Sequence, residues 1–315
     1  MYESKINLFV TCCNFKLATQ LDKYQIDYII VGIKDFSTRF NNYFDLETLS
    51  NLKQSLKYSK LCVCLNNIYS EFDISGLEKL LVKLDELKVD LVMFSDFAVA
   101  QIVDEKKLNL ELHYNPETLV TSYGQFDFYL ENKINKVNIA TELTLSEVKK
   151  ICENKKQMFV TIKGFGLGFI MHSRWNMIDT FVDYANLEKA KFNSVEYLLI
   201  KEDERKYPNI IYQDHTGTQM LTGFYICCIK QINELKATNI NGLIIDALFV
   251  HDDDKTLAYV VNAYKYALNH NLNQNQLNKL YHFIAQKVEL DISPNFFGNH
   301  SDVLHTLKES NENDK

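Results

Sequence analysis

The amino-acid sequence predicts an α/β fold arranged as a (β/α)8 barrel, also called a TIM-like barrel. Eight short apolar runs have the length of buried strands, and seven of them are separated by segments with helical spacing. Such units together occupy about 250 residues in a typical barrel of this kind. An open doubly wound sheet is the alternative. The first strand, however, runs into Cys12-Cys-Asn-Phe and not into a glycine-rich phosphate loop, so the barrel is preferred.

The expected strands are short runs of apolar residues bounded by polar or turn-forming residues. They are Ile6–Thr11, Tyr28–Gly32, Leu61–Leu65, Asp90–Phe94, Asn109–His113, Lys136–Ala140, Met158–Lys163 and Gly242–Asp246.

The segments between the strands carry apolar residues at helical spacing. Three helices have candidate N-terminal caps: Asp45 before Leu46–Lys57, Ser75 before Gly76–Lys88, and a capping box of Thr144 and Glu147 at Leu145–Glu153. The other helices are expected at Phe15–Lys23, Phe97–Val103, Pro116–Tyr129, Thr256–Leu268 and Gln274–Val288.

Residues of about 170–235 do not follow the strand–helix repeat, so they are expected to form an α+β insertion between strands seven and eight, over the barrel mouth. The insertion contains a helix-like piece at Trp175–Tyr184, short strands at Tyr197–Ile200, Ile210–Asp214 and Thr218–Leu221, and a helix at Phe224–Lys236. Residues 1–308 are expected to form a single domain, and the polar residues 309–315 a disordered tail.

Composition limits the function. The net charge of -7 argues against general nucleic-acid affinity but leaves room for a local basic patch. The sequence has no signal peptide and no apolar run long enough for a bilayer, so no membrane association is expected. Seven Cys without an export signal indicate a reducing cytoplasm and no disulfides. Two of them, Cys62 and Cys64, alternate on one strand and should face the same side.

Candidate site residues lie where the predicted strands end, because barrel enzymes build their sites from the loops at that face. A glycine-spaced loop at residues 164–175 leads to the polar side chains after strand seven. We expect Glu142, Asp246 and His172 to be catalytic. Ligand-binding side chains are expected at Lys34, Arg39, Asp96, Asn115, Glu117, Ser173, Arg174, Arg205 and Asp214, and a local basic patch would add Lys163, Lys201 and Lys206.

This mixture of cations and carboxylates suits an anionic ligand held by cations that carboxylates hold in turn. For each single residue, a helix cap or a rim ion pair is an equal alternative. No metal site is expected, because the sequence has no recognised zinc spacing. His113 ends a strand and is expected to be a half-buried, hydrogen-bonded side chain. His172 beside Ser173 is not a catalytic pair by adjacency alone.

Several motifs occur in an order that resembles the collagenase-like peptidase family U32, over about residues 6–298. They are Tyr28-Ile-Ile-Val-Gly-Ile-Lys-Asp-Phe-Ser-Thr-Arg39, Ser95-Asp96, His113-Tyr-Asn-Pro-Glu-Thr118, Thr141-Glu-Leu-Thr-Leu-Ser146, Lys206-Tyr-Pro with Asp214-His-Thr-Gly-Thr218, and Gly242-Leu-Ile-Ile-Asp246. The resemblance implies a TIM-like barrel. It places family motif positions at Arg39, Asp96, Asn115, Glu117, Glu142, Ser173, Arg174, Asp214 and Asp246.

The resemblance also implies three possible functions. The first is a component of oxygen-independent tRNA wobble-uridine hydroxylation, giving 5-hydroxyuridine, with tRNA and a prephenate-like anion as ligands and a longer paralogue as partner. The second is a peptidase of unknown catalytic type, and the third is a non-enzymatic scaffold for that paralogue. Many relatives hold an iron–sulfur cluster with cysteines after strand seven. Because no Cys occurs between Cys152 and Cys227, no cofactor is evident and the cluster is expected to be absent.

Overall fold

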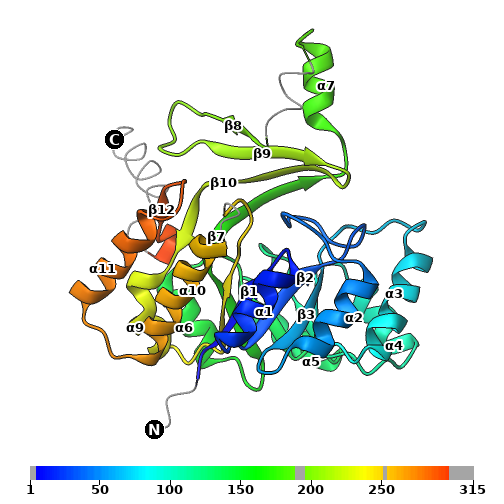
Figure 1. The fold of residues 1–315 in the computed structure, drawn as a ribbon, viewed down its shortest axis with the longest axis horizontal. Helices are drawn as coiled ribbons and strands as arrows, with labels where there is room; N and C mark the ends of the chain where they lie inside the picture. The colour runs from blue at the N-terminus through cyan, green and yellow to red at the C-terminus, as the bar shows by residue number, and fades with distance from the viewer. Residues whose placement is uncertain (1–4, 189–195, 251–253, 298–315) are drawn as a thin grey trace.

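Eight parallel strands close into a barrel in the computed structural model, which describes residues 5–188, 196–250 and 254–297. Each strand pairs with the next along the chain, and the last pairs with both the seventh and the first. The predicted (β/α)8 barrel is therefore confirmed (Figure 1). The barrel strands are β1 (Asn7–Thr11), β2 (Tyr28–Gly32), β3 (Lys60–Leu65), β4 (Leu91–Phe94), β5 (Leu112–Tyr114), β6 (Lys136–Asn138), β7 (Phe159–Ser173) and β11 (Gly242–Ile245).

Helices cover the outside of the barrel. They are α1 (Phe15–Lys23), α2 (Leu46–Ser55), α3 (Ile74–Glu86), α4 (Ala98–Glu105), α5 (Phe126–Glu131), α6 (Leu145–Glu153), α9 (Ile232–Ala237), α10 (Asp254–Asn269) and α11 (Gln274–Ala285), with 3-10 turns η1 (Tyr123–Gln125), η2 (Ile229–Gln231) and η3 (Asn295–Phe297). Among the described helices, none is long and apolar enough to cross a bilayer.

Two of the three predicted caps are confirmed. The Asp45 carboxylate accepts a hydrogen bond from the Thr48 amide at 2.7 Å, and Thr144 and Glu147 form the expected capping box on α6. The prediction for Ser75 is wrong, because α3 begins at Ile74, two residues before the predicted start at Gly76, and includes Ser75 in its first turn.

Three element predictions are corrected. The expected loop at residues 164–175 is mostly strand, because β7 continues through its glycines to Ser173. The expected helix Pro116–Tyr129 begins only at η1, since Glu117 has a left-handed φ of 65° that no helix tolerates. The expected helix Phe224–Lys236 starts as strand, because β10 (Gly217–Cys227) extends the sheet.

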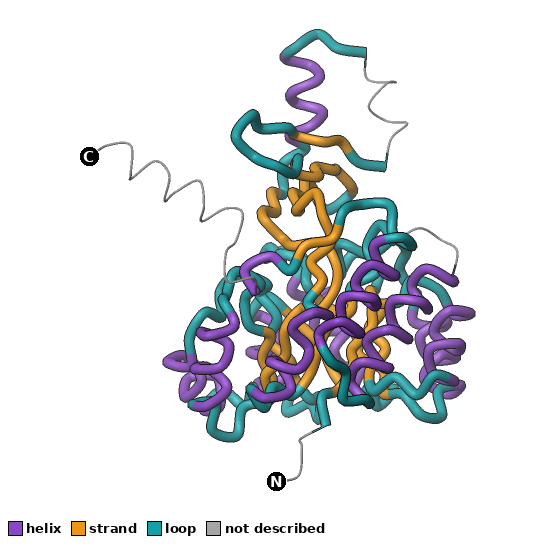
Figure 2. Tube along the Cα trace, turned by 90° about the vertical axis from the view of Figure 1, so that its left-hand side faces the viewer, coloured by secondary structure: helices purple, strands orange, loops and turns teal. Residues whose placement is uncertain are grey.

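The insertion lies between β7 and β11, as predicted. The upper half of β7 pairs antiparallel with β10, β10 with β9 (Asn209–Asp214), and β9 with β8 (Leu198–Ile200). Helix α7 (Met177–Tyr184) packs on β9 and β10, and β12 (Ile292–Ser293) adds to the base of β10. Figures 1 and 2 show this sheet projecting from the barrel. The single-domain boundary stays a prediction, and the predicted tail, residues 309–315, lies outside the described residues.

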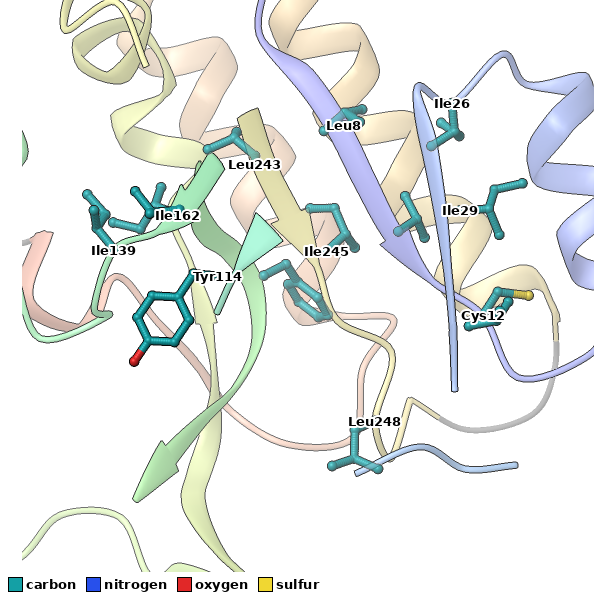
Figure 3. Packing of buried hydrophobic residues seen from close by; sticks show 14 of the residues in the cluster. Leu8, Cys12, Ile26, Ile29, Tyr114, Ile139, Ile162, Leu243, Ile245 and Leu248 are labelled. Atoms are coloured by element: carbon teal, nitrogen blue, oxygen red, sulfur yellow. The ribbon is translucent and has the colours of Figure 1, made fainter. Parts of the chain in front are cut away.

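Two apolar clusters stabilise the barrel. The larger one lies between the strands and the helices and includes Leu8, Ile29 and Leu243 (Figure 3). The smaller one fills the barrel interior around Phe9 and Tyr28, whose rings stack at 4.2 Å. The inner face of the barrel turns polar towards the carboxyl ends of the strands, where the candidate site lies.

Candidate functional site

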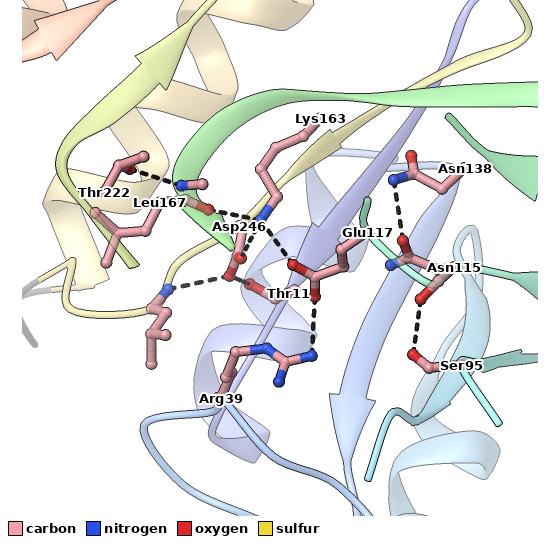
Figure 4. A network of polar contacts seen from close by, with 12 residues as sticks. Thr11, Arg39, Ser95, Asn115, Glu117, Asn138, Lys163, Leu167, Thr222 and Asp246 are labelled. Carbon is pink, nitrogen blue, oxygen red and sulfur yellow. Dashed lines mark hydrogen bonds and ion pairs between the residues drawn. The ribbon is translucent and has the colours of Figure 1, made fainter. Parts of the chain in front are cut away.

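Four charged side chains meet at the carboxyl end of the barrel and are called here the mouth network: Arg39, Glu117, Lys163 and Asp246 (Figure 4). The Lys163 ammonium lies 3.2 Å from Asp246 Oδ2 and 3.8 Å from Glu117 Oε2. Arg39 Nη2 lies 3.1 Å from Glu117 Oε1. Arg39, Glu117 and Asp246 were predicted as site residues, and Lys163 as part of the basic patch. The structure brings these four side chains together from four separate segments of the chain.

The backbone positions these side chains. Lys163 points inward from β7, and Asp246 directly follows β11, the strand paired with β7. Asp246 is held further by Thr11 Oγ1 at 3.3 Å and by the Leu248 amide at 3.2 Å. Arg39 has a left-handed φ of 64°, like Glu117 at 65°. Such backbone conformations in non-glycine residues cluster at functional sites.

Electrostatics keep the network charged. Burial alone raises the pKa of Glu117, but Arg39 and Lys163 outweigh burial and hold that pKa below its ordinary value. Burial likewise lowers the pKa of Arg39, but its neighbours, Glu117 first among them, together more than reverse this effect. The two cations therefore face two carboxylates, and the charges balance. One donor, the buried Arg39 Nε, has no hydrogen-bond partner.

The insertion covers the network. Arg39 Nη1 donates to Gln219 Oε1 at 3.1 Å, and the guanidinium lies 4.5 Å from the centre of the Phe169 ring. Gln219 is on β10 and is fully buried, and Phe169 is on β7. The outer sheet therefore packs directly on the guanidinium of Arg39.

A second polar chain runs down one side of the barrel interior. Asn138 donates to Asn115 Oδ1 at 3.0 Å, and Thr161 Oγ1 donates to Asn138 Oδ1 at 2.9 Å. Thr161 Oγ1 also lies 3.0 Å from His113 Nε2. This His is fully buried and its Nδ1 has no partner, which corrects the expected half-buried, satisfied side chain. Burial, helped by Lys136, lowers the pKa of His113 to about 3, so the ring is neutral.

Four predicted residues at the strand ends lie outside the mouth network. Asp96 accepts from the Ala98 amide at 2.9 Å, at the start of α4, and Asp214 accepts from the Thr216 amide at 2.8 Å in the β9–β10 turn. Both carboxylates thus bind nearby backbone amides, as expected if these residues cap helices or turns and bind no ligand. Lys34 and Glu142 are exposed. Their roles in ligand binding or catalysis stay predictions.

The remaining predicted residues belong to the insertion. His172 Nε2 lies 3.0 Å from the Thr216 carbonyl oxygen, and burial lowers the pKa of this ring. Ser173 Oγ accepts from the Trp175 amide at 3.2 Å, so Ser173 and His172 bind backbone atoms and not each other. Arg174 is exposed. Arg205 pairs with Glu202 at 3.0 Å in the turn between β8 and β9. This turn precedes Asn209 at the start of β9, whereas Asp214 ends that strand.

Sequence reasoning missed Gln219, Phe169, Asn138 and Thr161. Asn138 on β6 and Thr161 on β7 could have been noticed in the sequence, because a polar side chain within a buried barrel strand is uncommon. Gln219 and Phe169 left none, since both belong to segments whose strand pairing was not anticipated.

A cavity of about 440 Å³ lies at the opposite end of the barrel, where β1 begins. Its walls include Lys236 and Lys265. Lys236 donates to the carbonyl oxygens of Ala267 and His270, and Lys265 donates to that of Tyr24. Both lysines therefore bind backbone carbonyl groups at helix ends. This is a structural role, and it gives no reason to assign a ligand to the cavity.

A model of peptidase family U32 matches residues 14–307. The chain belongs to peptidase family U32. It is similar to tRNA hydroxylation protein P2 of Bacillus subtilis, with 26% identity over 225 residues, which cover 70% of this chain and 72% of that protein. It is also similar to an uncharacterized protease of Methanocaldococcus jannaschii, with 30% identity over 158 residues, or 47% of this chain and 37% of that protein.

Solved structures share the barrel only distantly. A glycerophosphodiester phosphodiesterase from Parabacteroides distasonis has a TM-score of 0.44 at 8% identity, covering 83% of this chain and 99% of that chain. The tryptophan synthase complex from Pyrococcus furiosus has a TM-score of 0.41 at 10% identity, covering 90% and 99%. The fold is defined by the strand pairing of this chain, and these distant similarities carry no further argument.

The cysteines of this U32 member do not fit a four-cysteine iron–sulfur cluster. Cys12 and Cys13 follow β1, whereas Cys62 and Cys64 lie within the barrel interior and Cys152 lies on α6. Cys227 and Cys228 lie at the base of the insertion, and burial raises the pKa of both. A cluster needs ionised thiolates that converge on one point. Across residues 5–188, 196–250 and 254–297, no three His, Cys, Asp or Glu side chains converge as a metal site.

Proposed function

We propose that this chain is a component of oxygen-independent hydroxylation of the tRNA wobble uridine, which gives 5-hydroxyuridine. Membership of family U32 and the similarity to a protein named for tRNA hydroxylation support the proposal. Its small ligand is an anion resembling prephenate, and its macromolecular ligand is tRNA. The chain acts in the cytoplasm.

The observation that carries this proposal is the buried mouth network. Arg39 and Lys163 place two cationic donors at the carboxyl end of a closed barrel, where barrel enzymes bind substrates. Arg39 retains one unpartnered donor there. The network pairs two cations with two carboxylates, so a ligand carboxylate that binds the cations keeps the buried charge balanced when Glu117 or Asp246 turns out towards solvent. This exchange avoids the large cost of an unpaired buried ion.

We further propose that the chain works as an accessory subunit beside a longer U32 paralogue. The scattered, mostly buried cysteines support this role, since they do not fit the cluster that many relatives hold. A peptidase activity has weaker support. It rests on the family description and on the name of the archaeal relative, whereas His172 and Ser173 both bind backbone atoms.

The test is mass spectrometry of tRNA nucleosides from a deletion strain that also lacks any oxygen-dependent uridine hydroxylase. We expect 5-hydroxyuridine derivatives to disappear and to return with the wild-type gene. Lys163→Met keeps the length of the side chain but removes its charge, and we expect at least a tenfold loss of product. Lys83→Met is the matched control, because Lys83 is exposed and pairs only along α3.

Unchanged nucleosides in the deletion strain would reject the proposal. Soluble Lys163→Met protein that restores full modification would remove the mouth network from the mechanism. Purified protein that degrades gelatin or casein would favour the peptidase alternative.

A further inference from the structure

Parts of three strands form a bent cover above the barrel mouth. Residues 165–173 of β7, with β10 and β9, are called here the ribbon. The lower part of β7 belongs to the barrel, and its upper part leaves the barrel to pair with β10. In Figure 1 the ribbon rises from the barrel and passes over the ends of the other strands. The same chain segment thus joins the rigid barrel to the outer sheet.

The ribbon bends where its strand pairing is interrupted. Leu167 pairs with Tyr225 and Phe169 with Leu221, so three residues of β10 stand opposite Gly168 alone. Such a bulge removes ladder hydrogen bonds and increases bending. The Thr222 side chain compensates, since its Oγ accepts from the Gly168 amide at 2.8 Å and donates to the Phe224 carbonyl at 2.8 Å. A second register shift follows between Leu221 and Met220, so the pairing of β7 with β10 is irregular on both sides of Leu221.

Beyond the bulge, the Phe169 ring and the Gln219 side chain both tie the ribbon to Arg39 of the mouth network. Gln219 Oε1 accepts from Arg39 Nη1 at 3.1 Å, and Gln219 Nε2 donates to Thr216 Oγ1 at 3.2 Å within the ribbon. The side chains of Arg39 and Lys163 are only 8% and 7% exposed, below the 12% and 17% of Glu117 and Asp246. The cations are therefore the less accessible members of the network.

We propose that the ribbon is a hinged cover, which opens by bending at the Gly168–Thr222 bulge and is held shut by Gln219 on Arg39. Opening exposes Arg39 and frees a second guanidinium donor, whereas Lys163 stays bound to the Leu167 carbonyl on the barrel side of the bulge. The cover regulates access to the site of the proposed function and rests on that function only for the identity of the ligand.

A native thiol reports on the cover. Cys64 lies on the inner face of β3, and burial raises the pKa of its thiol. Cys62 lies two residues earlier on the same face, deeper in the barrel. Opening of the ribbon should admit an alkylating reagent to Cys64 before Cys62. Peptide mass spectrometry follows both thiols in the same sample.

The first variant is Gln219→Leu, which keeps most of the side-chain volume but removes the hydrogen bond to Arg39. We expect N-ethylmaleimide to alkylate Cys64 about tenfold faster than in the wild type, with Cys62 unchanged. An unchanged Cys64 rate would show that Gln219 does not hold the cover shut. A parallel rise of both thiols would indicate global unfolding and would overturn the hinge.

The second variant tests the cover without disturbing the network. His215 Nε2 in the β9–β10 turn lies 3.9 Å from Asp35 Oδ1 in the loop after β2. This distance joins the tips of two longer side chains, so in Asp35→Cys with His215→Cys a bifunctional methanethiosulfonate reagent, which forms a reducible disulfide with each thiol, links ribbon and barrel. We expect N-ethylmaleimide to alkylate Cys64 at least tenfold more slowly in the linked protein than in the unlinked one, and prior reduction to restore the rate.

Asp179→Cys with Gln213→Cys is the matched control, because this pair joins α7 to β9 within the insertion. The control pair is linked with the same reagent. A control link that slows the alkylation of Cys64 equally, or a link between ribbon and barrel without effect, would overturn the proposal. The assay contains neither tRNA nor a small anion, so its outcome is independent of the proposed function.

Discussion

Single polar side chains determine the character of the barrel interior. His113 shows this clearly, because it is fully buried, contacts Thr161 through one nitrogen and leaves the other without a partner. A buried imidazole without a carboxylate partner stays neutral, since burial penalises the charged ring. Lys163 behaves differently, because two carboxylates surround it. The two buried side chains thus differ in their partners, a hydroxyl for His113 and two carboxylates for Lys163.

The lowered pKa of His113 makes stability depend on pH. The unfolded chain binds a proton at His113 near pH 6.5, whereas the folded chain does so only near pH 3. Between these values the unfolded state binds one proton more, so stability falls as the pH falls, by about 1.4 kcal/mol per unit from this residue. We expect His113→Gln to reduce the slope of unfolding free energy between about pH 6 and pH 4 by that amount.

Urea unfolding at each pH measures this slope. His282→Gln, at an exposed position on α11, should leave it unchanged. Parallel pH dependence of the His113 variant and the wild type would contradict a neutral buried ring.

At the scale of elements, β7 combines two roles. Its lower half is a barrel strand and its upper half is one edge of the ribbon, with Gly166 at the transition. Gly166 has a φ of 128°, and a Cβ there would lie 2.5 Å from the Cβ of Asp246. Only glycine lets β7 pass this close to the residue that completes the mouth network.

Gly166→Ala should therefore be costly. We expect a loss of at least about 2 kcal/mol in unfolding free energy, from backbone strain together with the contact at Asp246. Gly124→Ala is the matched control, because its added Cβ would meet only Ser122 Oγ at 3.5 Å, and its cost should be within about 0.5 kcal/mol. Urea denaturation measures both. Equal stability of the two variants would contradict the tight approach of β7 to Asp246.

At the scale of the whole molecule, burial separates the barrel from the outer sheet. All five residues of β2 are buried, whereas β8 is half-buried at Leu198 and exposed at Leu199 and Ile200. Strand β8 also pairs with only one described neighbour, β9. Regions with few buried contacts open locally, while central strands exchange their amides only when the whole fold opens.

Hydrogen exchange should show this difference directly. We expect the amides of β8 to exchange at least a hundredfold faster than those of β2 and β3 under native conditions. Mass spectrometry of proteolytic fragments measures the rates. Equal protection of β8 and β2 would mean that the outer sheet and the barrel open as one cooperative unit.

The sequence by itself determined the barrel, because eight apolar runs of strand length between amphipathic helices leave few other arrangements. Strand β2 and helix α1 were predicted with their observed bounds, since burial and helical periodicity are local signals. The position of Arg39, Glu117 and Asp246 at the barrel mouth was also predictable, because the ends of parallel strands meet at one face of a barrel. Only the tertiary structure decided that β7 and β10 form a ribbon over the mouth. The ribbon depends on pairing between residues far apart in the chain, and so does the burial of Gln219 against Arg39. The periodicity of a sequence reports only on neighbouring residues and does not predict such partners.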